Sequence, residues 1–175
     1  QGRGMTVTLT PFPAEQVDLL RGWLDATHVK RWWKPHWTAP VLEAFGAGTA
    51  LPDGLHPWRI DIDGRPIGYL HDYDVMLDGE VWLKVDRVGP GTRGIDILIG
   101  EADAVNRKHG RAAIRVITAK LFAEPGCDRV VADPHPDHWG AIIAFQKAGF
   151  RDKGRVIFPS GQVMVMAAAK AVWKP

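Results

Sequence analysis

The chain has 175 residues, of which 46% are hydrophobic and 24% are charged. This composition suits one globular domain with a sizeable core, and it excludes a disordered or fibrous protein. The net charge of +2 favours neither a nucleic-acid-binding protein nor a membrane-surface protein.

The first third of the chain predicts a strand followed by helices. Residues 1–4 are expected to be an extension left over from cloning, so that one domain spans 5–175. Val7 and Leu9 alternate with threonines, which indicates a strand. Apolar residues with helical spacing predict a helix over 14–26, and a second helix over 27–33 is expected to stop before Pro35. The stretch 35–57 is poorly periodic and predicts a loop with a short helix.

The rest of the chain alternates between strands and helices. A hairpin is predicted over 58–73, because Asp63-Gly64 supplies a tight turn between two alternating segments. The further predicted elements are strands at 95–99 and 129–132, helices at 108–124 and 137–148, and two final strands on either side of Pro159-Ser160-Gly161. This mixed α/β order predicts a central sheet with helices on both faces.

Charge is distributed unevenly along the sequence. Residues 72–103 contain eight acids and three bases, and the next stretch is basic, with Arg107, Lys108, Arg111 and Arg115. These bases surround Gly110 at a predicted helix start, where free backbone N–H groups and the helix dipole suit a pyrophosphate. Two surfaces of opposite sign predict two ligands of opposite charge, although two solvated faces would give the same pattern.

Several segments resemble the GNAT superfamily of N-acetyltransferases. Arg107-x-x-Gly110-x-Ala112 is similar to the loop by which these enzymes hold the pyrophosphate of acetyl-CoA. Aminoglycoside 6′-N-acetyltransferases are the most similar subgroup. The other segments that carry the resemblance are 23–33, Arg93-Gly94-Ile95-Asp96, the strand 94–99, Asp133-Pro134, Lys147-Ala148-Gly149-Phe150 and the hairpin 158–166.

The resemblance implies a GNAT fold, which is a mostly antiparallel, splayed sheet of six or seven strands with acetyl-CoA in the splay. It implies direct attack by an amine on acetyl-CoA through a tetrahedral intermediate, with backbone N–H groups of 97–100 polarising the thioester. The residues expected to hold acetyl-CoA are Ile97, Leu98, Ile99, Arg107, Lys108, His109, Gly110, Arg111, Ala112, His138 and Phe145.

The resemblance also assigns roles to two acids. Asp96 is expected to accept the proton of the attacking amine, because a protonated aminoglycoside amine cannot attack a thioester. Asp133 is expected to contact the substrate or to position water. The residues expected to hold the acceptor are Trp33, Asp72, Asp74, Asp96 and Asp133, with Asp78, Glu80, Trp32 and Trp37 as further candidates for an acidic wall and aromatic platforms. Solvated hairpin residues would give the same acids, and a packed core would give the same tryptophans.

Three positions depart from the family pattern. Lys108 falls where an ungapped match to the subgroup has the first loop glycine, whereas the Arg107-to-Ala112 match places Gly110 there. Phe145 replaces a tyrosine that protonates the departing thiolate, so water is expected to take that role. His138 replaces an asparagine that contacts CoA.

The sequence therefore predicts an acetyl-CoA-dependent N-acetyltransferase that modifies an aminoglycoside amine, with the 6′-amine as the expected site. Acylation of a siderophore hydroxylysine remains open, although such enzymes tend to carry histidine at the position of Asp96. Acetylation of a protein or another small amine and a non-catalytic CoA-binding module also remain open. No metal, nucleic-acid or membrane partner is expected, and the protein is expected to be a monomer or a homodimer. The single cysteine, Cys127, and the absence of a long apolar run favour a cytoplasmic protein.

Overall fold

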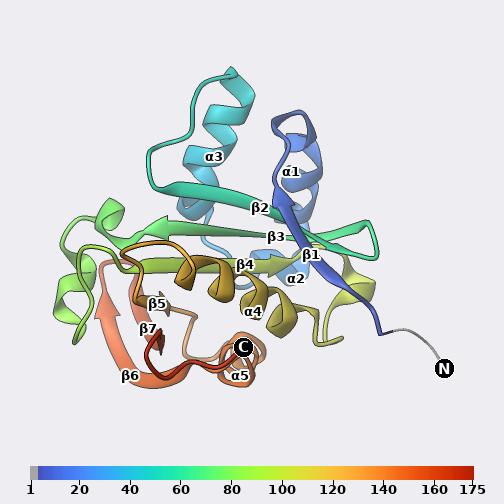
Figure 1. Ribbon diagram of the computed structural model, residues 1–175. Helices are drawn as coiled ribbons and strands as arrows, with labels where there is room; N and C mark the ends of the chain where they lie inside the picture. The colour runs from blue at the N-terminus through green and yellow to red at the C-terminus, as the bar shows by residue number, and fades with distance from the viewer. Residues whose placement is uncertain (1–3) are drawn as a thin grey trace.

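The computed structural model describes residues 4–175 and arranges the strands of this range in one mixed sheet of seven, in the order β1-β2-β3-β4-β5-β7-β6 (Figure 1). The strands are β1 (Val7–Pro11), β2 (Leu55–Ile62), β3 (Arg65–Asp74), β4 (Arg93–Ile99), β5 (Arg129–Ala132), β6 (Arg151–Phe158) and β7 (Gly161–Ala169). The α-helices are α1 (Val17–Asp25), α2 (Thr27–Lys30), α3 (Pro35–Ala47), α4 (His109–Phe122) and α5 (Trp139–Lys147). The 3₁₀ helices are η1 (Ala14–Gln16), η2 (Val75–Asp78), η3 (Val81–Lys84) and η4 (Ala102–Ala104). Of the expected extension at 1–4, residues 1–3 lie outside the described range.

The hairpin of β2 and β3 confirms the prediction made from its turn. Asp63 and Gly64 both have positive φ, at 48° and 83°, as a two-residue turn between right-twisted strands requires. Glycine adopts this conformation readily, and aspartate tolerates it better than most residues.

The sheet is mostly antiparallel, and its one parallel pair divides it into two halves. β4 and β5 pair only at Arg93–Val130 and Gly94–Val131. Beyond Gly94 the two strands separate, so the edge of β4 from Ile95 onward has no strand partner on that side within residues 4–175. The predicted splay in the middle of the sheet is confirmed, and it opens beside Asp96.

Each face of the sheet carries its own hydrophobic core. Residues of α4 and α5, such as Ile114, Ile117 and Ile142, pack on one face. Residues of α1 to α3, such as Leu20 and Val41, pack on the other face together with several aromatic side chains. Figure 1 shows α1 and α3 grouped together, away from α4 and α5. The prediction of helices on both faces is confirmed.

The region after Pro35 differs from the sequence prediction. Residues 35–47 form the 13-residue helix α3, which begins at Pro35 and contains Pro40. A proline fits the first turn of a helix, because the N–H group it lacks would have no partner there. Pro40 lies at the sixth position, where the N–H group it lacks would have donated to the carbonyl of His36, so α3 forms despite the loss of one hydrogen bond. Pro35 therefore begins a helix instead of only stopping the one before it.

None of the helices described between residues 4 and 175 is both long and apolar enough to cross a membrane.

Candidate active site

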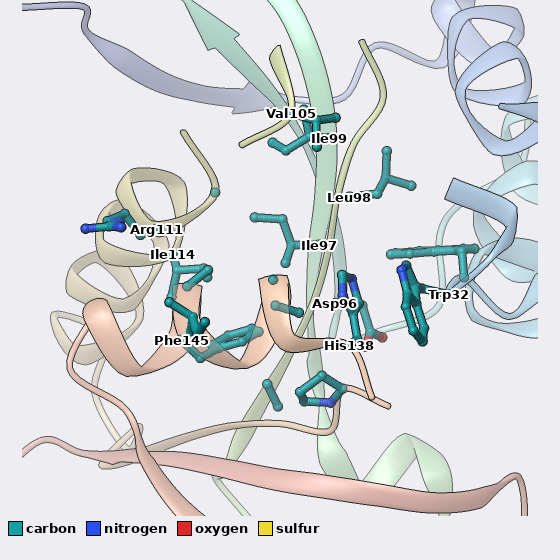
Figure 2. Close-up of a pocket in the computed structure, with 18 of the residues that line it drawn as sticks. Trp32, Asp96, Ile97, Leu98, Ile99, Val105, Arg111, Ile114, His138 and Phe145 are labelled. Atoms are coloured by element: carbon teal, nitrogen blue, oxygen red, sulfur yellow. The ribbon is translucent and has the colours of Figure 1, made fainter. Parts of the chain in front are cut away.

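A large pocket of about 800 Å³ opens where β4 and β5 separate. Its walls come from α2, the exposed edge of β4, the start of α4 and the start of α5. Figure 2 shows Ile97 on β4 facing Ile114 on α4 and Phe145 on α5. The expected acetyl-CoA residues that line it are Ile97, Leu98, Ile99, Arg107, Lys108, His109, Gly110, Arg111, His138 and Phe145. Ala112 is not part of this wall.

The start of α4 has the chemistry of an anion site. Gly110 and Arg111 belong to the first turn of a 14-residue helix, whose N–H groups have no partner in the preceding turn. A Cβ atom added to Gly110 would meet nothing within 4 Å, so the pocket reaches the helix backbone at this position. Basic residues in the first turn are unfavourable beside the helix dipole. An anionic ligand would offset that cost, and a pyrophosphate fits these groups.

Lys108 has a backbone conformation that glycine adopts more readily than other residues. Lys108 is the residue before α4 and has φ 67° and ψ 11°, in the left-handed region. A side chain in this region costs about 1–2 kcal/mol, whereas glycine adopts it freely.

Lys108→Gly should therefore stabilise the protein by about 1 kcal/mol relative to Lys108→Ala. Both variants remove the charge, and only glycine relieves the steric clash of the Cβ atom. Urea unfolding of the two variants measures the difference. Equal stability would show that the loop relaxes to another conformation when the lysine is removed.

An aromatic stack joins the segment after α2 to the N-cap of α5 in the wall of the large pocket. The rings of Trp32 and His138, both labelled in Figure 2, are stacked, with centres 4.5 Å apart and an interplanar angle of 7°. The guanidinium of Arg31 lies 4.8 Å from the centre of the Trp32 ring. Burial, followed by the positive charges of His135 and Arg31, lowers the pKa of His138 to about 4. His138 is therefore neutral at physiological pH and stacks as an uncharged ring.

Phe145 closes the inner end of the large pocket. Its side chain is buried and packs edge-on against Phe150, with ring centres 5.1 Å apart. It offers no proton to a leaving group, so that proton has to come from water or from another group.

A smaller pocket of about 350 Å³ meets the large pocket at three residues, namely Trp37, Asp96 and Asp133. Its other walls come from α3, β3, η2 and the β6–β7 turn, and they include His36, His71, Tyr73, Asp78 and Ser160. The two cavities therefore touch at a pair of carboxylates. An amine in the small pocket would face a thioester in the large pocket beside this pair.

Two carboxylates of the small pocket, Asp78 and Asp133, have raised pKa values. Burial, then the charge of Asp96, then that of Asp78 raise the pKa of Asp133 well above its usual range. Burial is also the main cause that raises the pKa of Asp78, against a hydrogen bond from the Trp82 indole. Three acids that influence one another around one cavity provide a site for a cation, which would relieve their repulsion.

Asp133→Asn should stabilise the empty protein at neutral pH. Because the pKa of Asp133 is higher in the folded state, the folded chain binds more protons than the unfolded chain between the two pKa values. Stability therefore falls as pH rises through that window, and asparagine avoids the loss. Below the ordinary aspartate range both states are protonated and the gain should vanish.

Thermal unfolding of Asp133→Asn and wild type at neutral and acidic pH measures this difference. Asp137→Asn is the matched control, because Asp137 is exposed and follows the same strand. A variant that is less stable than wild type at neutral pH would show that the Asp133 carboxylate has a compensating partner.

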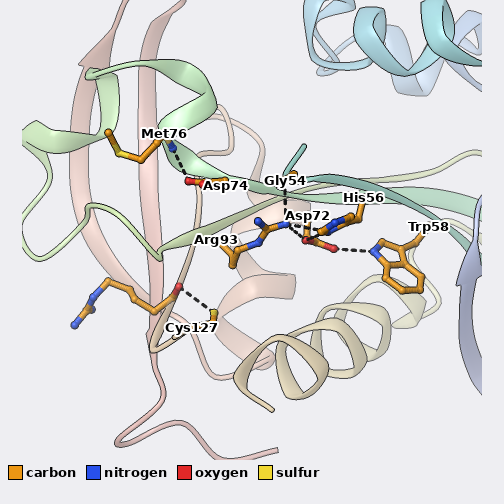
Figure 3. Close-up of polar contacts among 9 residues, drawn as sticks. Gly54, His56, Trp58, Asp72, Asp74, Met76, Arg93 and Cys127 are labelled. Carbon is orange, nitrogen blue, oxygen red and sulfur yellow. Dashed lines mark hydrogen bonds and ion pairs between the residues drawn. The ribbon is translucent and has the colours of Figure 1, made fainter. Parts of the chain in front are cut away.

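Asp72 and Asp74 differ from the expectation that they face the substrate. Asp72 is 1% exposed and accepts hydrogen bonds from His56 and the Trp58 indole, at 2.9 and 2.7 Å, and it also pairs with Arg93 (Figure 3). Side chains alternate along β3, so Asp72 lies on the α4 face, whereas the small pocket is on the other face.

Asp74 accepts a hydrogen bond from the backbone N–H of Met76 at 2.9 Å and so caps η2 (Figure 3). Neither Asp72 nor Asp74 lines either pocket. Trp33 does line the large pocket, but it is mostly a core residue. Its indole donates to Thr38 at 3.2 Å, and its ring packs edge-on against Trp37.

His71 is a pocket residue that the sequence analysis missed. It lies directly opposite Asp96 in the β3–β4 register, and its Nε2 atom is 2.8 Å from the Asp96 carboxylate. A histidine between Leu70 and Asp72 in a predicted strand gives no local signal of a site residue. Only the strand pairing would have revealed it.

No group of three or more His, Cys, Asp or Glu side chains within residues 4–175 is arranged to hold a metal ion.

Comparison with known proteins identifies the class. Residues 12–158 match the family described as "Acetyltransferase (GNAT) domain", and the chain belongs to this family. Members of the family are acetyltransferases that use acetyl-CoA.

Among named relatives, the aminoglycoside N(6′)-acetyltransferase type 1 of Klebsiella pneumoniae is 28% identical over 97% of this chain and 86% of its own length. The structure of AAC(6′)-Ib with coenzyme A and kanamycin is similar with a TM-score of 0.80 and 29% identity, covering 95% of this chain and 96% of that one. The N-hydroxyputrescine acetyltransferase of Acinetobacter baumannii is 27% identical over 69% of this chain and 56% of its own length.

Proposed function

We propose that the protein transfers an acetyl group from acetyl-CoA to an amine of an aminoglycoside, with the 6′-amine as the site. The observation that carries the proposal is the junction of the two pockets at Asp96 and Asp133. The large pocket offers a helix start and bases for the donor. The small pocket offers carboxylates for a cationic acceptor.

The donor binds along the splay, with its pyrophosphate at the start of α4. Lys108 and Arg111 neutralise phosphate charge, and the N–H groups around Gly110 donate to phosphate oxygens. The pantetheine arm lies along β4, where backbone groups beyond Gly94 lack a strand partner. Backbone N–H groups on this edge polarise the thioester oxygen. Trp32 and His138 cover the arm from the opposite side.

The acceptor binds in the small pocket as a polycation. Asp96 takes a proton from the ammonium group at the junction, and the neutral amine then attacks the thioester carbon. An N–C bond forms, a tetrahedral intermediate collapses and the C–S bond breaks. The nitrogen loses its second proton to water as the amide forms, and the CoA thiolate leaves and is protonated through water, since Phe145 carries no acidic proton. Burial and the charge of Asp96 raise the pKa of Asp133 and so favour its protonated form, and an incoming ammonium group favours its ionisation.

Acetylation of an N-hydroxylated diamine is a second candidate, because the relative from Acinetobacter baumannii acts on N-hydroxyputrescine. Such a substrate is short and carries few charges. A pocket with carboxylates at Asp78, Asp96 and Asp133 favours an acceptor with several ammonium groups. An aminoglycoside meets that requirement better than a diamine does.

A panel of acceptors tests the proposal with the purified chain and acetyl-CoA, with release of the CoA thiol as the readout. The panel holds aminoglycosides, N-hydroxylated diamines and lysine peptides. The proposal expects the highest kcat/KM for aminoglycosides. A higher value for the diamines would favour the second candidate. Tight acetyl-CoA binding without transfer to any acceptor would indicate a non-catalytic CoA-binding module.

A further inference from the structure

His71 is buried beneath the carboxylate that faces both pockets. It is 2% exposed and lies between two hydrogen-bond partners, the Tyr69 hydroxyl at 2.7 Å from Nδ1 and Asp96 Oδ2 at 2.8 Å from Nε2. It lines the small pocket only. The proposed reaction gives it no direct contact with the donor.

The identity of the two partners determines the position of the imidazole proton. An ionised carboxylate only accepts hydrogen bonds, so Nε2 must carry a proton and donate it to Asp96. A neutral ring then has a bare Nδ1 atom, which accepts from the Tyr69 hydroxyl. Burial raises the pKa of Tyr69 well above its usual value, with smaller effects from Asp96 and Asp72, so the hydroxyl keeps its proton. The chain of hydrogen bonds therefore runs from the Tyr69 hydroxyl through the His71 imidazole to the Asp96 carboxylate.

Aromatic rings hold the imidazole in this orientation. Tyr69, Tyr73 and Trp33 meet it edge-on, with ring centres 5.5, 5.9 and 6.0 Å away. These rings belong to a packed core and leave the imidazole little room to rotate. The hydrogen bond to Asp96 is consequently fixed at both ends, by the pairing of β3 with β4 and by the aromatic packing.

We propose that His71 is a positioning residue that holds Asp96 for proton transfer, with Tyr69 fixing its tautomer. The inference rests on the proposed function. The hydrogen bond occupies Oδ2 and leaves Oδ1 for the amine. It also favours the ionised form of the carboxylate, which is the form that accepts a proton. The titratable groups that face Asp96 are Tyr69, His71 and Tyr73 on β3, Asp78 on η2 and Asp133 after β5.

The first test compares His71→Met with His71→Gln. Methionine fills the space without a donor, whereas the glutamine amide nitrogen can replace Nε2–H. His71→Met should lower kcat roughly 10²-fold, as expected for a displaced catalytic group. His71→Gln should recover most of the activity. The KM for acetyl-CoA should not change in either variant, because His71 is absent from the large pocket.

The pH profile of kcat/KM separates positioning from a structural role. Without the donor from position 71 the ionised base is less favoured, so the acidic limb of the profile should move to higher pH in His71→Met. Tyr69→Phe should cause a smaller loss, and the loss should not add to that of His71→Met. Normal kcat and an unshifted limb in a folded His71→Met variant would overturn the inference.

A measurement on the empty protein keeps this inference separate from the proposed function. Nitrogen-15 NMR of the histidine rings should show His71 with a protonated Nε2 and a bare Nδ1, and this signal should disappear in His71→Gln. A proton on Nδ1 would overturn the inference even in an active enzyme. If no acceptor in the panel is acetylated, the proposed function fails, and the NMR result still decides the arrangement of His71.

Discussion

Asp96→Asn should lower kcat by about 10²–10⁴-fold, the usual contribution of a general base. Asparagine keeps the size of the side chain and most of its hydrogen bonding, but it removes the base and the negative charge. The side chain is 11% exposed and faces both pockets. The affinity for acetyl-CoA should change little, because the phosphate-binding groups lie at the other end of the large pocket. Steady-state kinetics together with calorimetry measure both quantities.

Asp86→Asn is the matched control. Asp86 belongs to the same acidic stretch, but its side chain is 93% exposed and lines neither pocket. Asp86→Asn changes the net charge by the same amount as Asp96→Asn does, and it should leave kcat near the wild-type value. A similar decrease in both variants would mean that overall charge, and not a base at position 96, controls the rate. Near-normal turnover in Asp96→Asn would move the search for the base to Asp133.

Arg111→Gln should weaken acetyl-CoA binding about 10- to 100-fold, because a hydrogen bond to a charged group contributes about 1.5–3 kcal/mol. Arg111 lines the large pocket at the start of α4, as Figure 2 shows. The variant should also lose part of the salt dependence of binding, since fewer charges meet the phosphates. Calorimetry at two salt concentrations measures the affinity and its salt dependence.

Arg115→Gln is the control for this charge. Arg115 is one turn further along α4, where its guanidinium donates to the backbone carbonyl of Lys147, and it does not line the large pocket. The affinity of the Arg115→Gln variant for acetyl-CoA should stay within about threefold of the wild-type affinity. If Arg111→Gln instead raised the KM for the aminoglycoside alone, the assignment of donor and acceptor to the two pockets would be reversed.

Local patterns in the sequence were sufficient to predict most of the elements. The Asp63-Gly64 turn was sufficient to predict the β2–β3 hairpin, and it sets the pairing of Ile62 with Arg65 and of Asp61 with Pro66. Beyond Asp61 the register shifts by one residue, which the turn does not predict. The splay between β4 and β5 was predicted from the family resemblance. Sequence patterns did not predict helix α3. A proline at position 35 is compatible both with the end of one helix and with the start of another, and the apolar spacing around Pro40 is too weak to distinguish a helix from a loop.

The residues of the site depended on long-range pairing, which the sequence does not display. Asp96 and Asp133 were predicted as site residues from the resemblance. In the structure they lie together where the two pockets meet. Asp72 was expected at the substrate from its charge, yet Arg93, His56 and Trp58 surround it on the opposite face. Charge alone could not distinguish a buried ion pair from a binding surface.

The most direct test of the account is acetyl transfer to two aminoglycosides that differ only in a 6′-amine or a 6′-hydroxyl group. The account predicts that the purified protein acetylates the 6′-amino compound, with one CoA thiol released per acetyl group and NMR placing the amide on the 6′-nitrogen. It also predicts at least a 10²-fold lower kcat/KM for the 6′-hydroxyl compound. Equal rates for the two compounds, or transfer to neither while an N-hydroxylated diamine is acetylated, would contradict it.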